Sequence, residues 1–544
     1  DGKADLLDQR DQALRDLSSK IDISYFKRDT GAIVIQTTNG ITLLDSEPHK
    51  LSHSSITQAS PLTSYAGGGI SGIYVDGKDI TNSIKDGELK GLIEVRDVTL
   101  PSLQSQLDEL AGNLMSEINQ IHNRGTAYPN TPSELTGTRT FIKNTTDPTK
   151  DDYPQRMSIE NGDVRFTIFD SDGNQYATTT LKSMTPPFEN GTISEMTTAL
   201  QDWMRNEAGL PQAEVYINSD GKLVMNTGES EYGLSMLDEA LSTPGSAQQD
   251  VTIKFDSNGN GLYDREFEGF SNFFGMNDFF VKQNNDSIYD SKVMSANANL
   301  GVRDTTTWSF SDSSSGLNYG TITITANSSL QDIVNSINNN PALSNNIRAS
   351  LVPNGSGYML RIENRSGDQL EISENVAPGA APSNLIAKLG LEPSNATTAM
   401  TIKVRDDIKT NPDLIAGGTP QFNGSTGKYV QNPGANDIAN AMGKVFTETT
   451  DFKQSGTIAQ TTTTLANYAS TFVGNIASQA SNAQSSWSYQ SELTSSISLK
   501  EAKVSGVDLD EELGQMIIFQ QTYAACAQAF TASKEILDML LNIV

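Results

Sequence analysis

A short loop in the middle of the chain carries the residue pattern of a calcium site. In "DSNGNGLYDREF", residues 256–267, loop positions 1, 3, 5, 6 and 9 are held by Asp256, Asn258, Asn260, Gly261 and Asp264. Carboxylate and amide oxygens at this spacing bind calcium. Position 12, which needs a bidentate glutamate, is Phe267. Because Asn and Gly also form tight turns, two interpretations stay open: a turn between strands, or a calcium site formed by Asp256, Asn258, Asn260 and Asp264.

The other metal-binding or nucleophilic side chains are few and isolated. His49 and His53 are four residues apart, but Pro48 indicates a loop and no third ligand is near, so we expect surface residues. Cys526 is the only cysteine, which excludes an intrachain disulfide, and its surroundings lack the positive charge that activates a thiolate. No zinc-protease motif, nucleophile elbow or phosphate-binding glycine loop occurs. We therefore predict no catalytic residues and, calcium aside, no cofactor.

Composition and charge narrow the class of protein further. The chain has 544 residues, enough for several domains, and a formal net charge of -28 from 66 acidic and 38 basic residues. Nucleic acids and anionic lipid surfaces require a concentrated basic surface. No apolar run approaches the ~18 residues of a membrane span. These observations exclude binding to nucleic acid and insertion into a membrane. They favour an assembly or surface protein over an enzyme.

The elements that position these residues fall into two classes. Helical apolar spacing marks both ends of the chain, in residues 4–21, 88–96, 100–121, 433–503 and 509–544. Pro101 suits the first turn of a separate helix. Between these segments the spacing has period two, and Asn39-Gly40 and Asp76-Gly77 indicate tight hairpins.

An internal repeat occupies the middle of the chain. The clearer copy runs from "YGTITITANSSLQDIVNSINN" to "NLIAKLGL", and the weaker copy from "YATTTLKS" to "SNFFGMNDF". Each copy predicts a strand, a helix, a hairpin and a closing hydrophobic segment. Two tandem α+β modules, at about residues 156–281 and 302–400, are therefore expected.

The predicted fold class is α+β and multidomain. Both ends of the chain form a discontinuous helical rod, a coiled-coil-like bundle, into which β-rich domains are inserted. The predicted segments are 1–22 (rod helix), 23–87 (small β section), 88–125 (rod helices), 126–400 (β-rich region), 401–432 (connector), 433–503 (rod helices) and 504–544 (C-terminal assembly helix).

The last helix has an apolar stripe that a soluble chain should not leave in water. Gly506 separates this helix from the one before it, and the chain ends on apolar residues. We predict an assembly and chaperone interface formed by Leu509, Leu513, Met516, Tyr523, Phe530, Leu537, Leu541 and Val544. The segment should be mobile before assembly and buried only in the assembled state.

Four stretches resemble flagellar proteins. "SGVDLDEELGQMIIFQQTYAACAQAFTASKEILDMLLNI" resembles the C-terminal signature of flagellar axial proteins, with Thr522 and Cys526 where that family usually has Ala and Asn. "ADLLDQRDQALRDLS", "GELKGLIEVRDVTLPSLQSQLDELAGNL" with "INQIHNRG", and "IKVRDDIKTNPDLIAGG" resemble the flagellar hook-associated protein 1 family. The repeat resembles a β-rich module inserted in flagellins and hook-associated proteins. The family's N-terminal helical segment is missing from the sequence, which we expect to be the protein without its front end.

The resemblance implies a structural subunit of the bacterial flagellum that joins hook to filament. It implies self-association and contacts with the hook protein, the second junction protein and a flagellar export chaperone. It also implies an extracellular location, reached by type III export without a cleaved signal peptide. The alternatives are another flagellar axial protein of hook or filament type, or a flagellar scaffold that displays a calcium- or glycan-binding module.

Overall fold

The computed structural model describes residues 2–56, 65, 69–141, 153–257, 261, 263, 265–282, 287–302, 305–312, 317–375, 385–506 and 509–541. The chain divides into two compact units, Asp1–Phe472 and Val473–Val544. Helices and antiparallel strands occur together, so the α+β class is confirmed. The boundaries proposed above for individual domains stay predictions. In the described segments, no helix has the length and apolarity needed to cross a membrane.

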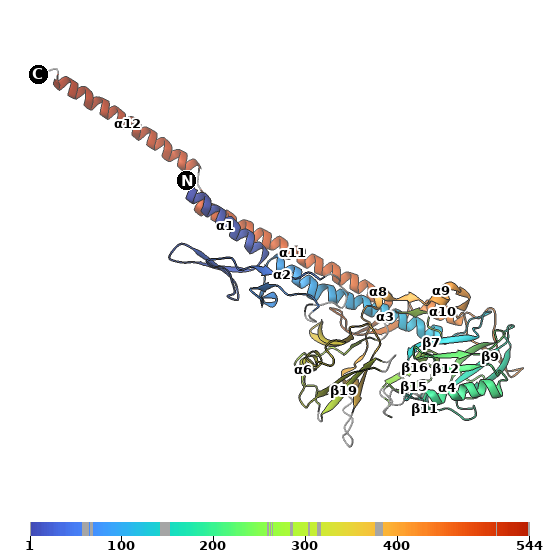
Figure 1. Ribbon diagram of the computed structural model, residues 1–544. Coiled ribbons are helices and arrows are strands. Elements are labelled where there is room, and N and C mark those ends of the chain that lie inside the picture. Colours follow the sequence, from blue (N-terminus) through green and yellow to red (C-terminus); the bar gives the residue numbers. More distant parts are fainter. Residues whose placement is uncertain are drawn as a thin grey trace. The chain divides into compact units, whose positions relative to one another are not determined.

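The N-terminal helices lie within the first unit (Figure 1). Helix α1 is Gly2–Lys20, α2 is Glu88–Glu94 and α3 is Leu100–Asn123. The expected break before Pro101 is wrong, because a π-helical turn, η2 (Val95–Thr99), connects α2 to α3 without leaving helical geometry. Pro101 lies in the first turn of α3, but because the helix continues through η2, its missing N–H leaves a carbonyl of the preceding turn without its usual helical donor.

The small β section confirms both predicted hairpins. Its two three-stranded sheets are β1-β2-β3 and β4-β5-β6, formed by Ile23–Lys27, Ile33–Thr37, Thr42–Leu44, Leu51–Ser52, Tyr74–Val75 and Lys78–Asp79. Asp76 and Gly77 both have positive φ, 49° and 80°, which is the geometry of a type I′ turn. A 3-10 turn, η1 (Thr81–Ser83), follows. Side chains from α1 and α2 pack on this section's core, which includes Ile21, Ile35 and Ile80.

The first module of the repeat is built from three antiparallel sheets, β10-β9-β14, β11-β8-β15-β16 and β12-β13-β7. Their strands, β7 to β16 in order, are Glu134–Thr140, Arg156–Glu160, Asp163–Phe169, Gln175–Thr180, Asn190–Thr192, Glu214–Ile217, Lys222–Asn226, Gly233–Glu239, Thr252–Asp256 and Arg265–Glu268. Helix α4 (Ile193–Asp202), the π-helical turn η3 (Trp203–Glu207) and α5 (Phe270–Phe274) supply side chains to the same core. Strand β7 precedes residue 156, so this module draws on residues outside the predicted repeat.

The second module has two antiparallel sheets, β20-β19-β23 and β21-β22-β18-β24. Strands β18 to β24 are Ile288–Asp290, Thr306–Asp312, Asn318–Ile324, Ile347–Asn354, Gly357–Asn364, Leu370–Asn375 and Glu392–Pro393. Helices α6 (Leu330–Asn338) and α7 (Leu385–Leu389) contribute to its core.

The two copies of the repeat share the same local order of elements. In each, a strand is followed by one helix, α4 or α6, and then by a hairpin (Figure 1). Both helices begin with a capping box: Thr192 with Glu195, and Ser329 with Asp332. The N-cap hydroxyl and the carboxylate three residues later each accept a backbone N–H, which satisfies donors that a helix start leaves open.

The segment between the second module and the last helices is made of short elements. They are α8 (Thr398–Thr401), α9 (Asp406–Thr410), η4 (Pro412–Leu414) and α10 (Asp437–Lys444), with the strand pairs β26–β27 (Gln421–Asn423 and Lys428–Val430) and β28–β29 (Thr449–Phe452 and Thr461–Thr464). Strand β25 (Lys403–Val404) of this segment pairs with β17 (Phe280–Val281), which precedes the second module. The run "TTTT" was expected to start a helix but forms β29, in agreement with the high strand propensity of threonine.

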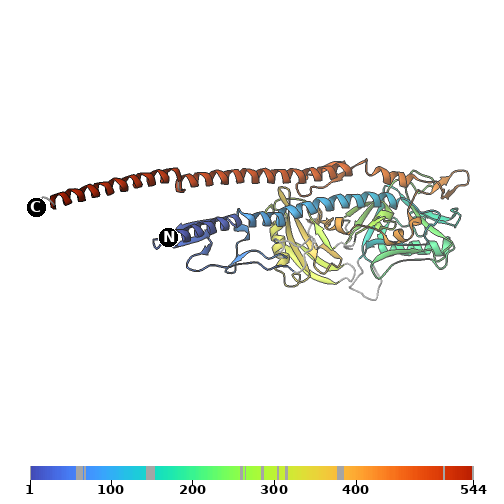
Figure 2. The same cartoon turned by 90° about the horizontal axis from the view of Figure 1, so that it is seen from above.

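Two long helices end the chain. Helix α11 is Leu465–Ser505 and α12 is Leu509–Leu541, and each is uninterrupted (Figure 2). Gly506 follows α11 as predicted; a Cβ atom there would lie 2.2 Å from the carbonyl oxygen of Ala502. The sequence therefore ends α11 where only glycine fits.

Candidate functional sites

Helix α12 exposes its apolar side chains along its whole described length. The predicted interface residues whose side chains are described are between 49% and 79% exposed: Leu509, Leu513, Met516, Tyr523, Phe530 and Leu537. Val544 and the side chain of Leu541 lie outside what the structure describes. The helix therefore presents to solvent the residue types that proteins normally bury.

The exposed apolar surface of α12 is wider than the predicted stripe. Six further apolar side chains are 49–71% exposed: Ile517, Ile518, Phe519, Ile536, Met539 and Leu540. A helix that is apolar on several faces is typical of one buried on several sides. These residues lie outside the single heptad face that the apolar spacing predicted; the run "MIIFQQ" was the available signal.

Helix α3 buries polar residues whose burial its apolar spacing did not predict. Its predicted apolar stripe is buried only near the C-terminus, at Ile118 and Ile121, and Leu100 is 57% exposed at the other end. The buried polar residues of α3 are Gln106, Asp108, Glu109, Asn119, His122 and Asn123. Three of them, Asn119, His122 and Asn123, belong to the motif "INQIHNRG". Their side chains attach α3 to the rest of the first unit.

His122 is held between two backbone groups. Its Nδ1–H donates to the carbonyl of Asn277 at 2.6 Å, and its Nε2 accepts the N–H of Ala416 at 2.9 Å. Burial lowers the pKa of His122 to about 4. The imidazole is therefore neutral at pH 7, with one nitrogen donating and one accepting.

Two asparagines on α3 complete this contact with the segment after α5. Asn119 accepts the N–H groups of Phe279 and Phe280 and donates to the carbonyl of Phe280 at 2.8 Å. Asn123 donates to the carboxylate of Asp278 at 2.7 Å and accepts from Ser271 and Asn277. Because each amide both donates and accepts, the first module is fixed in register on α3.

Two carboxylates attach a second segment to the same helix. Asp108 accepts the N–H groups of Thr397 and Ala399, both at 2.9 Å, and Glu109 accepts the N–H of Lys453 at 2.7 Å. Gly112 faces this segment, and a Cβ atom there would lie 2.4 Å from the side chain of Asn395. Helix α3 thus holds loops that are 289 to 344 residues away in sequence, through hydrogen bonds to its buried carboxylates.

The candidate calcium loop connects β15 to β16, an antiparallel pair, as the turn interpretation predicts. Asp256 is buried and accepts the N–H of Gly261 at 2.6 Å. Asn258, Asn260 and Asp264 lie outside the described residues. Among the residues that are described, no three His, Cys, Asp or Glu side chains gather as metal ligands, and the calcium site stays a prediction.

The two predicted surface histidines have separate partners. His49 Nδ1 lies 2.5 Å from a carboxylate oxygen of Asp76, and this hydrogen bond raises the pKa of His49. His53 Nδ1 donates to the carbonyl of Gly72 at 3.2 Å. Each imidazole ring therefore has a hydrogen-bond partner in its own β section. The single cysteine, Cys526, is exposed on α12.

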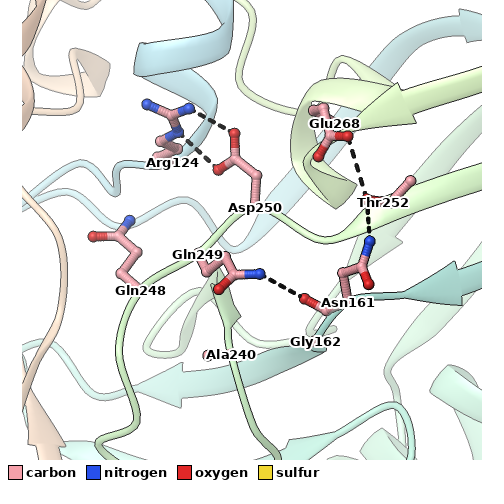
Figure 3. Close-up of a pocket in the computed structure, with 9 residues that line it drawn as sticks. All are labelled: Arg124, Asn161, Gly162, Ala240, Gln248, Gln249, Asp250, Thr252 and Glu268. Atoms are coloured by element: carbon pink, nitrogen blue, oxygen red, sulfur yellow. Dashed lines mark hydrogen bonds and ion pairs between the residues drawn. The ribbon is translucent and has the colours of Figure 1, made fainter.

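A polar groove of about 890 Å³ opens beside the end of α3 (Figure 3). It is lined by Arg124, Asn161, Gly162, Ala240, Gln248, Gln249, Asp250, Thr252 and Glu268. Arg124 follows α3, and the other residues belong to the first module. No sequence motif marks the groove, because its residues come from five separate segments.

In the comparison with known proteins, two family models match the two ends of the chain. Residues 1–136, which contain α1 to α3, match the family model described as flagellar hook-associated protein FlgK helical domain. Residues 502–543, which contain α12, match the model described as flagellar basal body rod FlgEFG protein C-terminal.

Individual relatives are more distant. The chain is 28% identical over 160 residues to flagellar hook-associated protein 1 of Salmonella typhimurium and of Salmonella typhi. The alignment covers 28% of this chain and about a quarter (24%) of the length of each relative. The flagellar hook junction protein FlgK from Burkholderia pseudomallei aligns with 92% of this chain and 78% of that chain, at 16% identity and a TM-score of 0.29. The N-terminal helices are therefore similar to the helical domain of flagellar hook-associated proteins, and the C-terminal helix is similar to the C-terminal region of flagellar rod proteins.

Proposed function

We propose that the protein is a structural subunit of the bacterial flagellum that joins hook to filament and assembles through its terminal helices. The observation that carries the proposal is α12: a 33-residue helix with exposed apolar side chains, in a segment that matches a flagellar axial-protein model. The N-terminal match to the hook-associated helical domain selects the junction type among axial proteins.

The exposed surface is large enough to drive assembly. Burying a Leu, Ile, Met or Phe side chain contributes about 1.5–3 kcal/mol, and association costs an estimated ~4–15 kcal/mol in lost freedom. One or two buried side chains contribute only about 1.5–6 kcal/mol, near the low end of that cost, whereas ten or more contribute at least about 15 kcal/mol and offset it. Assembly through α12 therefore requires most of its apolar residues to be buried together.

The helical rod is the second part of the proposal. Five apolar side chains on α2, η2 and α3 are 38–59% exposed within the first unit: Leu92, Val95, Val98, Leu100 and Leu107. They form a natural contact for other helices of the rod, from this chain or from neighbouring subunits, in a coiled-coil-like bundle. Tyr25 and Phe26, 60% and 51% exposed on the edge strand β1, offer a further contact for a neighbouring copy.

The partners follow from this placement. We propose self-association, contacts with the hook protein and the second junction protein, and a flagellar export chaperone that covers the apolar residues of α12 before assembly. The protein acts outside the cell, after type III export without signal-peptide cleavage. The proposed role uses surfaces and no catalysis, in keeping with a structural family.

Another axial protein, of hook or filament type, is the second candidate. The C-terminal model favours it in part, because its description names rod proteins. Electron microscopy of a deletion strain distinguishes the two. A junction protein leaves hooks without filaments and flagellin shed into the medium, whereas hookless basal bodies would support the hook type.

The direct test places two charges on α12. The double variant Leu513→Asp and Leu537→Asp should fail to enter the flagellum and should not bind the export chaperone. The loss of two apolar contacts and the burial of two carboxylates cost far more than about 3 kcal/mol together. Incorporation is measured by immunoblotting of purified hook–filament structures.

The control is Gln528→Asp, which adds one charge to α12 at a polar position and removes no apolar side chain. It should reduce incorporation much less than the double variant does. Normal incorporation of the double variant would contradict the proposal that α12 is the assembly surface.

A further inference from the structure

The polar groove beside α3 has side chains fixed in place by hydrogen bonds. The guanidinium of Arg124 donates from Nε and Nη2 to the two carboxylate oxygens of Asp250, at 2.8 and 2.6 Å (Figure 3). Gln120 donates to the same carboxylate at 3.1 Å. Because the pair is bidentate, the orientation of the guanidinium is set before any ligand arrives.

The opposite side of the groove is fixed by a chain of hydrogen bonds. Asn161 Nδ2 donates to the hydroxyl of Thr252 at 3.1 Å, and that hydroxyl donates to Glu268 Oε1 at 3.2 Å. Gln249 Nε2 donates to the carbonyl of Asn161 at 2.9 Å. In Figure 3, Asn161, Thr252 and Glu268 lie to one side of Asp250, and Arg124 lies to the other.

Several polar atoms of the groove remain open. Within the described part of the chain, no hydrogen bond is made by Arg124 Nη1, the Gln248 amide, Asn161 Oδ1 or Glu268 Oε2. Arg124 Nη1 can only donate, Asn161 Oδ1 and Glu268 Oε2 accept, and the Gln248 amide does both. Donors and acceptors that are already oriented lower the ordering cost of binding a polar ligand.

The lining selects the class of ligand. No aromatic or large aliphatic side chain lines the groove, so it has no surface for a lipid, a nucleotide base or an apolar peptide anchor. The one guanidinium is neutralised by Asp250, and Glu268 leaves an excess negative charge, which disfavours phosphates and other anions. A ligand rich in hydroxyl groups, each of which donates and accepts, fits the open atoms.

We propose that this groove binds a neutral oligosaccharide. This function is separate from assembly and does not rest on it. Because the contacts are hydrogen bonds without apolar burial, the affinity of one groove is weak, with a Kd on the order of 1 mM. An assembly that carries many copies would strengthen attachment to a glycan-covered surface through multivalency.

The test uses the full chain and three defined probes: maltotriose, cellotriose and chitotriose. Saturation-transfer NMR at about 10 mM trisaccharide detects a Kd in the millimolar range. We expect transfer to at least one probe, and at least a fivefold loss in the variant Gln248→Ala/Glu268→Ala. Both side chains are exposed, so the variant should keep the native circular dichroism spectrum.

The matched control is Gln212→Ala/Glu207→Ala, which removes the same residue types from exposed positions of the first module outside the groove. It should bind like the unmodified chain. No transfer to any of the three probes would overturn the proposal. Equal binding by the groove variant and the control variant would overturn it as well, and neither result would affect the assembly function.

Discussion

His122 shows what a single buried side chain does in this molecule. It connects the N–H of Ala416 to the carbonyl of Asn277, which belong to two segments far apart in the sequence. Its ring also packs edge-on against Phe279, with 5.3 Å between ring centroids. A neutral imidazole fits this position; a charged one would have to donate where Nε2 now accepts.

The pH dependence of this contact follows from the direction of the shift. Burial lowers the pKa of His122 from 6.5 to about 4, so the folded state resists protonation. Stability from the neutral ring is present above pH 6.5 and is lost as the pH falls toward 4, by up to about 3 kcal/mol. Arg405 lowers the pKa and Asp407 raises it, both less than burial does.

We predict that the amide of Ala416 becomes less protected from hydrogen exchange between pH 7 and pH 5, after correction for intrinsic rates. In His122→Gln, whose amide can donate and accept at the same places, that pH dependence should vanish and protection at pH 7 should fall by about 1 kcal/mol. A variant that keeps the same pH profile as the unmodified chain would show that His122 is not the titrating group.

Asp238, a partly buried carboxyl group, changes stability with pH in the opposite direction to His122, so the comparison with His122→Gln is necessary. Burial raises the pKa of Asp238 to about 7, above its usual 3.8. Its stabilising effect is therefore present below pH 3.8 and declines as the pH rises toward 7. Global melting would mix the two effects, whereas exchange at Ala416 reports the His122 contact.

At the scale of elements, α3 and α12 are opposite cases. Helix α3 has buried apolar and polar partners on several sides, with Gln106, Asp108 and His122 almost fully buried. Helix α12 has none of its described side chains buried. A helix without tertiary contacts is only marginally stable in water, because most helical stability in proteins comes from packing.

Hydrogen exchange on the monomeric protein should separate the two helices. We expect residues 509–541 to exchange within seconds to minutes, while residues 106–123 of α3 stay protected for hours. In purified flagella, protection of residues 509–541 should approach that of α3. Strong protection across residues 509–541 in the monomer would mean that α12 is an ordinary core helix, and its assignment as the assembly surface would fail.

At the scale of the whole molecule, the buried cores all belong to the first unit. The last buried hydrophobic side chain among the described residues is Tyr468, which stacks on Phe452 with 4.0 Å between ring centroids. Residues from 473 onward belong to the second unit, where the described side chains are mostly exposed. Folding of the first unit should therefore not depend on α12.

We predict that a chain ending at Ala480 melts within about 2 °C of the full chain, since a larger change would require about 1 kcal/mol of lost contacts. It should also fail to enter the flagellum. As a positive control, Phe452→Ala should lower the melting temperature clearly, because it removes a buried aromatic worth about 3–5 kcal/mol. A strongly destabilised truncation would show that the second unit supports the first. Calorimetry measures the melting temperatures of the truncated chain and of Phe452→Ala.

The sequence by itself determined the features that depend on near neighbours. Asn39-Gly40 and Asp76-Gly77 predicted their hairpins because the positive φ of Gly40, Asp76 and Gly77 is a local property. The strand, helix and hairpin of each repeat copy, the end of α11 at Gly506 and the apolar residues of α12 were readable for the same reason. The family resemblance at both ends rested on continuous stretches that the family models also match.

Only the tertiary structure decided which face of α3 is buried. Apolar spacing predicted one stripe, yet Leu100 and Leu107 are exposed while Asp108 and His122 are buried. Burying a carboxylate or an imidazole is unfavourable unless a partner is present. Those partners, such as Thr397 and Ala416, come from loops almost 300 residues away, so local spacing contains no record of them.

The groove was hidden from the sequence for the same physical reason. Asn161, Gln248 and Glu268 are ordinary surface residues in their own segments. They become a binding surface only when three strand ends and the end of α3 meet, and when Arg124 pairs with Asp250 across 126 residues. Sequence determines which side chains carry hydrogen-bonding groups; the fold determines which of those groups find partners and which remain open to a ligand.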